Sequence, residues 1–205
     1  MNNSTKIILF DVDGVLLNLP YYFGEVLLEK GYKINNILDK FYSSDEYQQS
    51  FLEEVDLEKI VEPYLKEFGW EKSSKEYFDE LFEFEAQFFN QELLDIIKKI
   101  KETGVECILC TNKNKIRFNF VINYLKDIFE KGFTSCDVGF LKNQEEFWKY
   151  VLKNLKERYP EIKPEEIAFF DDKQVNIDVA SRFGLNSFLF TDIDKFKKDL
   201  DKLIK

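Results

Sequence analysis

The stretch KIILFDVDG, residues 6–14, decides the fold. Residues 6–10 form a short, continuous apolar run, which is typical of a β-strand that is buried on both faces of a parallel sheet. Two carboxylates, Asp11 and Asp13, follow this run directly, and Gly14 permits a tight turn after them. The sequence therefore predicts a buried first strand that carries acidic side chains at its carboxyl end.

Downstream of residue 90, apolar runs alternate with amphipathic helical patterns. Strands are predicted at 105–110, 132–136, 166–170 and 186–190, and helices at 91–104, 114–128, 144–158, 172–184 and 194–204. Strands that alternate with helices of ten or more residues favour a parallel sheet with helices on both faces. We therefore predict an α/β, Rossmann-like catalytic domain built from residues 1–17 and 91–205.

Residues 18–90 have a different pattern, in which helical periodicity dominates and no convincing strand occurs. Helices are predicted near 20–30, 45–54, 56–67 and 74–89. Acidic residues outnumber basic ones more than twofold in this segment, and it contains no arginine. We predict that it forms a small, all-helical domain inserted into the sheet domain.

The chain has 205 residues and a formal net charge of −10. Nucleic acids and anionic membrane surfaces bind to basic patches, so neither is expected as a partner. No apolar run approaches the ~20 residues that span a bilayer, and residues 1–10 lack the layout of a signal peptide. We expect a cytoplasmic protein that acts on a small molecule.

The sequence contains no histidine, which excludes Ser-His-Asp and Cys-His catalysis and the commonest general base. Cys107 and Cys110 form a C-x-x-C pair, but a redox or zinc site needs exposed thiolates or two further ligands. Within the apolar run VECILC they are interpreted as small buried residues. Any chemistry therefore depends on carboxylates, hydroxyls, lysines and a hard metal ion.

Polar side chains follow the predicted strands at their carboxyl ends. Parallel strands bring these ends to one edge of the sheet, where ligands of open α/β folds bind. Carboxylates that converge there repel one another. A hard divalent cation with oxygen ligands neutralises this repulsion, and Mg²⁺ fits best. Taken singly, a DxD motif can be only a turn, and a DD pair only a helix N-cap. The side chains concerned are Asp11 and Asp13, Thr111 and Asn112, Lys142, and Asp171 and Asp172.

These motifs (FDVDG, the hydroxyl–Asn pair of CTN, Lys142 and FFDD) resemble the four ordered motifs of the haloacid dehalogenase (HAD) superfamily of phosphotransferases. The position of the helical insertion resembles that of the superfamily's helical cap. The resemblance implies a Mg²⁺-dependent phosphatase that hydrolyses a small phosphomonoester through an aspartyl-phosphate. Asn143 stands where the superfamily usually has proline, and CTNKNK is a less usual second motif, so the local loop geometry stays open.

The resemblance also implies a role for each motif residue. Asp11 is the implied nucleophile, Asp13 the general acid and base, and Lys142 the residue that balances the charge between nucleophile and phosphoryl group. The implied phosphate-binding residues are Thr111, Asn112 and Gly14, and the implied metal ligands are Asp11, Asp13 through its main-chain carbonyl, Asp172, and Asp171 through water or hydrogen bonds.

The insertion is rich in aromatic residues, most of which we expect in its own core. Tyr21, Tyr22 and Phe23 follow the catalytic loop closely and are candidates for lining the pocket. Bidentate recognition of a carboxylate or a second phosphate favours arginine, and Arg117 is the arginine expected to approach the site. We therefore predict a sugar phosphate or nucleoside monophosphate as substrate in preference to phosphoglycolate or a bisphosphate.

Three alternatives use the same residues. A phosphomutase or other phosphotransferase differs in how well the cap excludes water, which the sequence does not show. A dehalogenase is disfavoured by Asp13, because a halide leaving group needs no proton. A catalytically idle binding protein could use the fold as a scaffold. A receiver domain places its acidic residues in a different order and is set aside.

Overall fold

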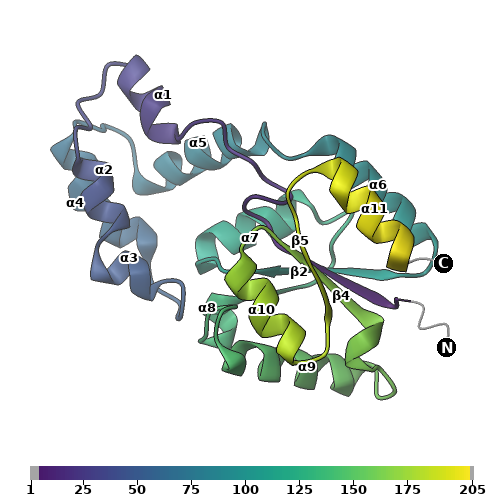
Figure 1. Ribbon diagram of the computed structural model, residues 1–205. Helices are drawn as coiled ribbons and strands as arrows, with labels where there is room; N and C mark the ends of the chain where they lie inside the picture. Colours follow the sequence, from purple (N-terminus) through teal and green to yellow (C-terminus); the bar gives the residue numbers. More distant parts are fainter. Residues whose placement is uncertain (1–4, 204–205) are drawn as a thin grey trace.

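The computed structural model describes residues 5–203, and within them the strands form one five-stranded sheet (Figure 1). The strands are β1 (Ile7–Phe10), β2 (Glu106–Thr111), β3 (Gly132–Thr134), β4 (Ile167–Asp171) and β5 (Asn186–Leu189). Their order across the sheet is β3-β2-β1-β4-β5, and every neighbouring pair is parallel. The predicted Rossmann-like α/β fold is confirmed.

Helices cover both faces of this sheet. They are α6 (Gln91–Glu102), α7 (Lys115–Tyr124), α8 (Ser135–Val138), α9 (Glu145–Arg158), α10 (Gln174–Arg182) and α11 (Ile193–Leu203), with a 3-10 turn, η1 (Pro164–Glu166). Ile8 and Phe10 of β1 pack with side chains of α6, α7 and α11, whereas Ile7 and Leu9 pack with α9 and α10. This alternation follows from the two-residue period of a strand, and it explains why β1 is apolar throughout.

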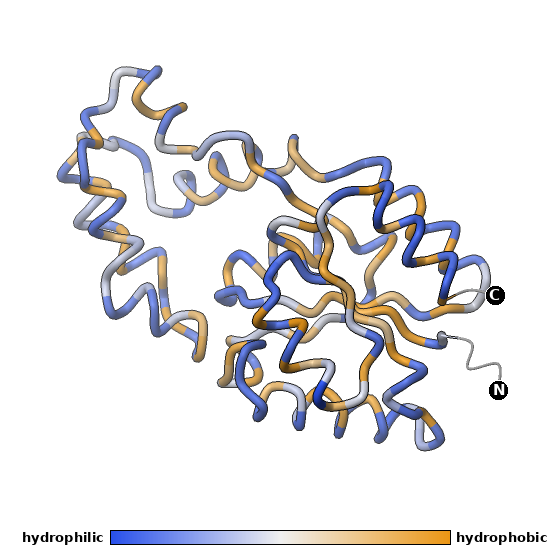
Figure 2. Tube along the Cα trace, in the orientation of Figure 1, coloured by the Kyte–Doolittle hydropathy of each residue, from blue (hydrophilic) through white to orange (hydrophobic). Residues whose placement is uncertain are grey.

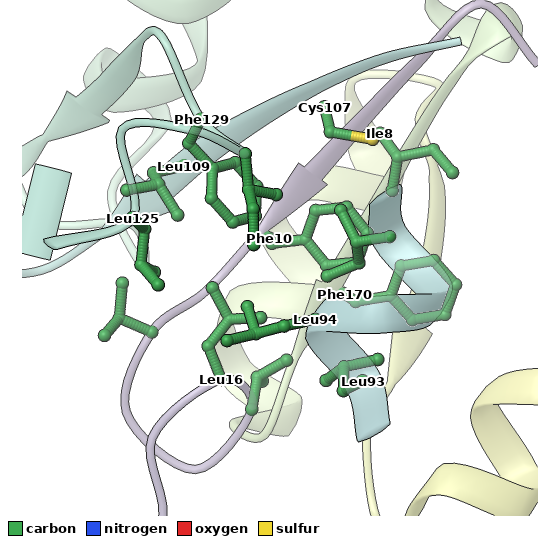
Figure 3. Close-up of a cluster of buried hydrophobic side chains, with 14 of the residues drawn as sticks. Ile8, Phe10, Leu16, Leu93, Leu94, Cys107, Leu109, Leu125, Phe129 and Phe170 are labelled. Atoms are coloured by element: carbon green, nitrogen blue, oxygen red, sulfur yellow. The ribbon is translucent and has the colours of Figure 1, made fainter. Parts of the chain in front are cut away.

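Figure 3 shows the first of these clusters, with Phe10 at its centre. The ring of Phe10 stacks on Phe170 of β4 at a centroid distance of 5.9 Å, and it meets Phe129 edge-on at 6.0 Å. Burying one such side chain contributes about 1.5–3 kcal/mol. In Figure 2 the strands are mainly hydrophobic, while the helices alternate between hydrophobic and hydrophilic residues along the chain. The sheet is therefore the centre of the core, and Asp11 begins where the apolar β1 ends.

The segment between β1 and α6 contains only helices among its regular elements. They are α1 (Phe23–Glu29), α2 (Ile37–Tyr42), α3 (Asp45–Gln49), α4 (Leu57–Glu67) and α5 (Ser74–Ala86), and they lie to one side of the sheet in Figure 1. They share a hydrophobic cluster of their own, in which Phe41, Val61 and Tyr77 are completely buried. Ser73 begins α5 with a capping box to Glu76, which satisfies backbone N–H groups at the start of the helix.

Several local predictions differ from the structure, and the helix predicted at 114–128 ends at Tyr124. Helix α2 was not predicted, because six residues are too few for a clear helical period. The helix predicted at 45–54 ends at Gln49, and Ser50 is its C-cap. The strand predicted at 132–136 ends at Thr134, because Ser135 begins the short helix α8.

The three cysteines are free and buried, and Cys107 and Cys110 both lie within β2. Burial raises the pKa of the Cys107 thiol to about 12, so a thiolate is disfavoured at neutral pH. This agrees with the interpretation of the C-x-x-C pair as core residues. Among the described residues, no helix has the length and apolarity needed to cross a bilayer.

Candidate active site

The register of the sheet aligns the carboxyl ends of the three central strands. Phe10 pairs with Leu109 of β2 on one side and with Phe170 of β4 on the other. The next residue, Asp11, donates its backbone N–H to the carbonyl of Phe170 at 3.0 Å. Side chains that follow β1, β2 and β4 are therefore brought to one edge, as the sequence predicts.

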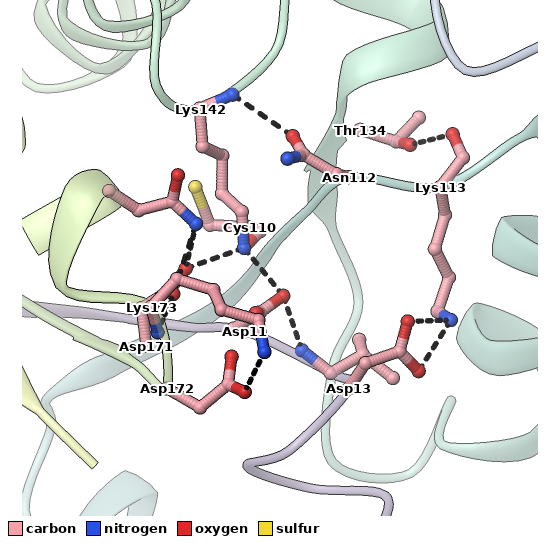
Figure 4. Close-up of polar contacts among 12 residues, drawn as sticks. Asp11, Asp13, Cys110, Asn112, Lys113, Thr134, Lys142, Asp171, Asp172 and Lys173 are labelled. Carbon is pink, nitrogen blue, oxygen red and sulfur yellow. Dashed lines mark hydrogen bonds and ion pairs between the residues drawn. The ribbon is translucent and has the colours of Figure 1, made fainter. Parts of the chain in front are cut away.

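Lys142 lies at the centre of this edge and joins two of its acidic residues (Figure 4). Its Nζ lies 2.6 Å from Asp11 Oδ1 and 2.6 Å from Asp171 Oδ2. All three side chains are almost inaccessible to solvent, with exposed fractions of 1%, 7% and 0%. Burial lowers the pKa of Lys142, but the two carboxylates outweigh this and raise it above its ordinary value. The structure thus brings together Lys142 and Asp11, as predicted, and holds the lysine charged.

The ionisation of Asp11 is strongly perturbed at this edge. Burial, the largest cause, and the charge of Asp171 raise the pKa of the Asp11 carboxyl to about 7, against the opposing effect of Lys142. A carboxylate in this position is therefore disfavoured unless further positive charge is present. The carboxyl-end edge of the sheet at Asp11 therefore favours the binding of a cation.

The three carboxylates of Asp11, Asp171 and Asp172 offer oxygen atoms that all lie within 4.8 Å of one another. A site made only of carboxylate oxygens suits a hard divalent cation such as Mg²⁺. Gly14 is needed beside it, because its φ is +74° and a Cβ built there would lie 2.5 Å from Cγ of Asp172. Glycine at position 14 therefore lets the loop that follows β1 approach the acidic cluster.

Asp171 is fixed by its neighbours. Asn176 of α10 donates from Nδ2 to both of its carboxylate oxygens, at 3.0 Å each, and the backbone N–H of Lys173 donates to Oδ1 at 2.7 Å. Asp172 is more accessible and forms an ion pair with Lys173 at 2.8 Å. The carboxylate of Asp171 is thus held by protein groups, whereas that of Asp172 is the more accessible of the two.

Asp13 lies beside a lysine that sequence reasoning did not select. Lys113 Nζ donates to both carboxylate oxygens of Asp13, at 2.8 Å each. Partial burial raises the pKa of Asp13, but the charges of Lys113 and Arg117 outweigh it and hold the pKa below its ordinary value. In the sequence, Lys113 is one of two lysines in CTNKNKIR, and only its position two residues after Thr111 distinguishes it from Lys115.

The four consecutive residues 111–114 of the second motif make different contacts. The hydroxyl of Thr111 is buried and has no hydrogen-bond partner among the described residues. Asn112 Oδ1 accepts the backbone N–H of Lys142 at 3.0 Å, which ties the second motif to the lysine loop. The N-cap of α7 is Asn114, whose Oδ1 accepts the N–H of Arg117 at 3.1 Å. Thr111 and Asn112 are therefore not needed as helix caps.

A cavity of about 750 Å³ opens onto this edge and is lined by both parts of the chain. Asp11, Asp13 and Asn112 line it from the sheet side. From the helical segment, Tyr22 and Phe23 line it as expected, together with Tyr42, Tyr47, Phe51 and Glu85. Tyr21 is outside the lining and packs against Phe84 and Phe88 at centroid distances of 5.4 and 5.8 Å.

Arg117 reaches the cavity, as the sequence predicts, but it does not have a free charge. Its guanidinium forms an ion pair with Glu85 of α5, whose side chain is only 3% exposed. Glu85 could not be selected in the sequence, because it is one of many acidic residues in a helical segment. The pair connects α7, which follows the second motif, with α5 of the helical segment.

Comparison with known proteins agrees with this geometry. A family model for haloacid dehalogenase-like hydrolases matches residues 5–184. The rat bifunctional epoxide hydrolase 2 is 27% identical over 125 residues, which is 58% of this chain and 22% of that protein. A probable pseudouridine-5'-phosphatase of Saccharomyces cerevisiae is 29% identical over 99 residues, which is 44% of this chain and 42% of that protein. The chain spans less than half the length of these relatives.

Solved structures share the whole fold. A HAD family enzyme from Bacteroides thetaiotaomicron superposes with a TM-score of 0.69 at 24% identity, covering 92% of this chain and 94% of that one. It has also been crystallised with magnesium and with inorganic phosphate. A HAD-like hydrolase from Porphyromonas gingivalis has a TM-score of 0.69 at 19% identity, covering 98% of both chains. Fold and family match together assign this chain to the haloacid dehalogenase-like hydrolases.

Proposed function

We propose that this hydrolase is a Mg²⁺-dependent phosphatase that cleaves a small phosphomonoester through an aspartyl-phosphate on Asp11. The observation that carries the proposal is the buried contact of Lys142 with Asp11 and Asp171, next to Asp172, at the open edge of the sheet. A nucleophilic carboxylate, a fixed ammonium and a cation site in one place are the parts that phosphoryl transfer needs.

In the first step, the Asp11 carboxylate attacks the phosphorus atom. The bond from phosphorus to the leaving oxygen breaks, and that oxygen takes a proton from Asp13. A phosphoryl dianion beside Asp13 raises the pKa of its carboxyl, which favours the protonated form at this stage. Lys142 stays charged and offsets negative charge that develops between Asp11 and the phosphoryl oxygens.

In the second step, water attacks the phosphorus of the aspartyl-phosphate. Asp13, now a carboxylate, takes the proton of that water, and the bond between phosphorus and Asp11 breaks. Inorganic phosphate leaves, and both carboxyl groups return to their starting states. The lowered pKa of Asp13 beside Lys113 favours the carboxylate that this step requires.

The residues that would hold Mg²⁺ are Asp11, Asp172 and the main-chain carbonyl of Asp13, with Asp171 supporting them. The chemistry that the ion supplies is neutralisation of the charge on the transferring phosphoryl group. Thr111, whose buried hydroxyl has no partner among residues 5–203, is proposed to donate to a phosphoryl oxygen together with Asn112.

The helical segment 18–90 is proposed to be a cap over a core made of 1–17 and 91–205. Two observations support this division. The helices have their own hydrophobic cluster, and the two connections between the parts lie side by side, with Leu17 bridging Phe89 and the N–H of Asn90 donating to Leu16 at 2.8 Å. Closure of such a cap would exclude water from the first step.

The test is a phosphate-release panel run with Mg²⁺ on the whole protein and on Asp11→Asn. We expect release from a sugar phosphate or a nucleoside monophosphate, and the similarity to a probable yeast pseudouridine-5'-phosphatase supports the second of these. Asp11→Asn should lower kcat by ~10³-fold or more, since it removes the nucleophile. Asp137→Asn, at an exposed position outside the cavity lining, should leave the rate unchanged.

The same panel separates the alternatives. A strict mutase releases no inorganic phosphate from p-nitrophenyl phosphate, and an idle binding protein turns over no phosphomonoester with Mg²⁺. Either result would overturn the proposal.

A further inference from the structure

The ion pair between Arg117 and Glu85 stands inside the cavity that contains Asp11 and Asp13. Arg117 is fixed from the core side, because it lies in the first turn of α7 and its N–H is held by the N-cap residue Asn114. Glu85 is fixed from the other side by its place in the last turn of α5. The pair therefore joins the two parts of the chain in the wall that a bound leaving group would face.

Every basic side chain that lines the cavity has a carboxylate partner within the described residues. Lys142 contacts Asp11 and Asp171, Lys113 contacts Asp13, Lys173 contacts Asp172, and Arg117 contacts Glu85. The three lysines surround the edge of the sheet where the phosphoryl group would bind. Arg117 is therefore the cation that would contact the leaving group of the substrate. Because Glu85 already neutralises it, a second anionic group on the substrate would have to displace a buried carboxylate.

The pair offers both kinds of hydrogen-bonding group. It uses one guanidinium nitrogen and one carboxylate oxygen in its own contact, while a guanidinium has five N–H donors and a carboxylate two acceptor oxygens. A hydroxyl group both donates and accepts, so neighbouring hydroxyls can bind an arginine and a carboxylate at the same time. Tyr47 and Phe51 supply an aromatic wall close by, which suits the apolar face of a sugar or a base.

We propose that the Arg117–Glu85 pair determines substrate preference, by binding hydroxyls of a neutral leaving group and rejecting one with a carboxylate or a second phosphate. This inference rests on the proposed phosphatase activity and names the class of its substrate. Hexose phosphates and nucleoside monophosphates both have neighbouring hydroxyls, so the experiment includes both.

The sharpest test compares a neutral hexose phosphate with a carboxylated one. Glucose 6-phosphate and 6-phosphogluconate have the same number of carbons, and only the second has a carboxylate. Glu85→Gln frees the charge of Arg117, so the ratio of kcat/KM for 6-phosphogluconate to that for glucose 6-phosphate should rise by about tenfold or more, mainly through KM. Glu83→Gln, an exposed residue on the same helix, is the matched control and should leave the ratio unchanged.

A second comparison tests hydroxyl recognition. If a nucleoside is the natural leaving group, kcat/KM should be higher for uridine 5'-monophosphate than for its 2'-deoxy analogue. If a hexose is the natural leaving group, the enzyme should turn over glucose 6-phosphate faster than either nucleotide. In the double variant Arg117→Met/Glu85→Gln, kcat/KM for the hydroxylated substrates should fall about tenfold relative to that for p-nitrophenyl phosphate. The double variant removes both charges together, so it tests the specificity role of the pair even if Glu85→Gln does not fold.

An unchanged substrate ratio in folded Glu85→Gln, or an unchanged ratio in the double variant, would overturn the inference. Hydrolysis of p-nitrophenyl phosphate by the unaltered protein distinguishes failure of the specificity role from failure of the proposed phosphatase activity. If that hydrolysis occurs and the ratios do not move, the specificity role fails while the phosphatase activity stands. If it does not occur, the proposed function fails first.

Discussion

Lys113 holds both carboxylate oxygens of Asp13 through a single ammonium group, at 2.8 Å each. The side chain of Lys113 is 2% exposed, whereas that of Asp13 is 59% exposed, so the lysine is the fixed partner. Thr134 anchors it further by donating its hydroxyl to the Lys113 carbonyl at 2.7 Å. Lys113 therefore positions the proposed acid and base, in addition to contributing charge.

Lys113→Met should lower kcat by about ten- to a hundredfold for an alkyl phosphate, because Asp13 loses its orientation and general acid–base catalysis is worth about 10²–10⁴-fold. The loss should be smaller for p-nitrophenyl phosphate, whose leaving group needs little protonation. Lys113→Arg should restore part of the rate for the alkyl phosphate.

The control for this prediction is Lys115→Met. Lys115 lies two residues further along, pairs with Asp137 at 2.6 Å and does not line the cavity. Steady-state kinetics should be unchanged in it. Equal losses for both substrates in Lys113→Met would indicate a general structural defect and contradict the positioning role.

Mg²⁺ should stabilise the folded protein, because it relieves repulsion among Asp11, Asp171 and Asp172. At a hundredfold excess over its dissociation constant, a ligand adds about 2.7 kcal/mol, which corresponds to a rise in Tm of roughly 5–11 °C for a chain of this size. Asp172→Asn should lose most of this rise in a thermal melt. Asp178→Asn, an exposed position on α10, should keep it.

Gly14→Ala should weaken Mg²⁺ binding more than it weakens folding. Its Cβ would lie 2.5 Å from Asp172 Cγ, and the φ of +74° adds strain of about 1–2 kcal/mol. Gly104→Ala has a similar φ of +90° with nothing within 4 Å of its Cβ, so it controls for backbone strain alone. The Mg²⁺ concentration for half-maximal activity should rise by about tenfold in Gly14→Ala only. Equal shifts in both variants would show that the close approach to Asp172 is irrelevant.

The proposed division into core and cap can be measured with the two tryptophans of the chain. Trp70 lies in the cluster of the helical segment, and Trp148, a residue of α9, packs against Phe169 of the sheet. Phe41→Ala should destabilise the helical segment by about 3–5 kcal/mol, since Phe41 is completely buried there. In a Trp148→Phe background the Trp70 fluorescence should report an early transition, while in a Trp70→Phe background Trp148 should report a late one. A single coincident transition in both backgrounds would contradict independent units.

The strands and the acidic edge were predictable because each has a local signal. A continuous apolar run followed by Asp11 or by Asp171 needs only the parallel topology to place both acids together, and the register confirms it. Lys142 was identified through its place as the third of four ordered motifs that resemble those of the superfamily. These features are encoded in neighbouring residues, so reading the chain in order was enough.

The residues that were missed depend on contacts across the fold. Lys113 and Asp13 are a hundred positions apart, and only the folded sheet brings them together. Glu85 meets Arg117 across the junction of the two parts of the chain, and nothing in its own helix distinguishes it from Glu83. A charged residue with no local pattern is interpreted by default as solvent-exposed, and burial corrects that interpretation only after the partner is known.

The central claim is that Asp11 carries the phosphoryl group during turnover. The most direct measurement is acid quenching of the enzyme within a turnover of p-nitrophenyl phosphate and Mg²⁺, followed by mass spectrometry of the peptide that contains Asp11. We predict one phosphoryl group on Asp11 and none in Asp11→Asn. Phosphate release with no labelled Asp11 at any quench time, or normal turnover by Asp11→Asn, would contradict the mechanism.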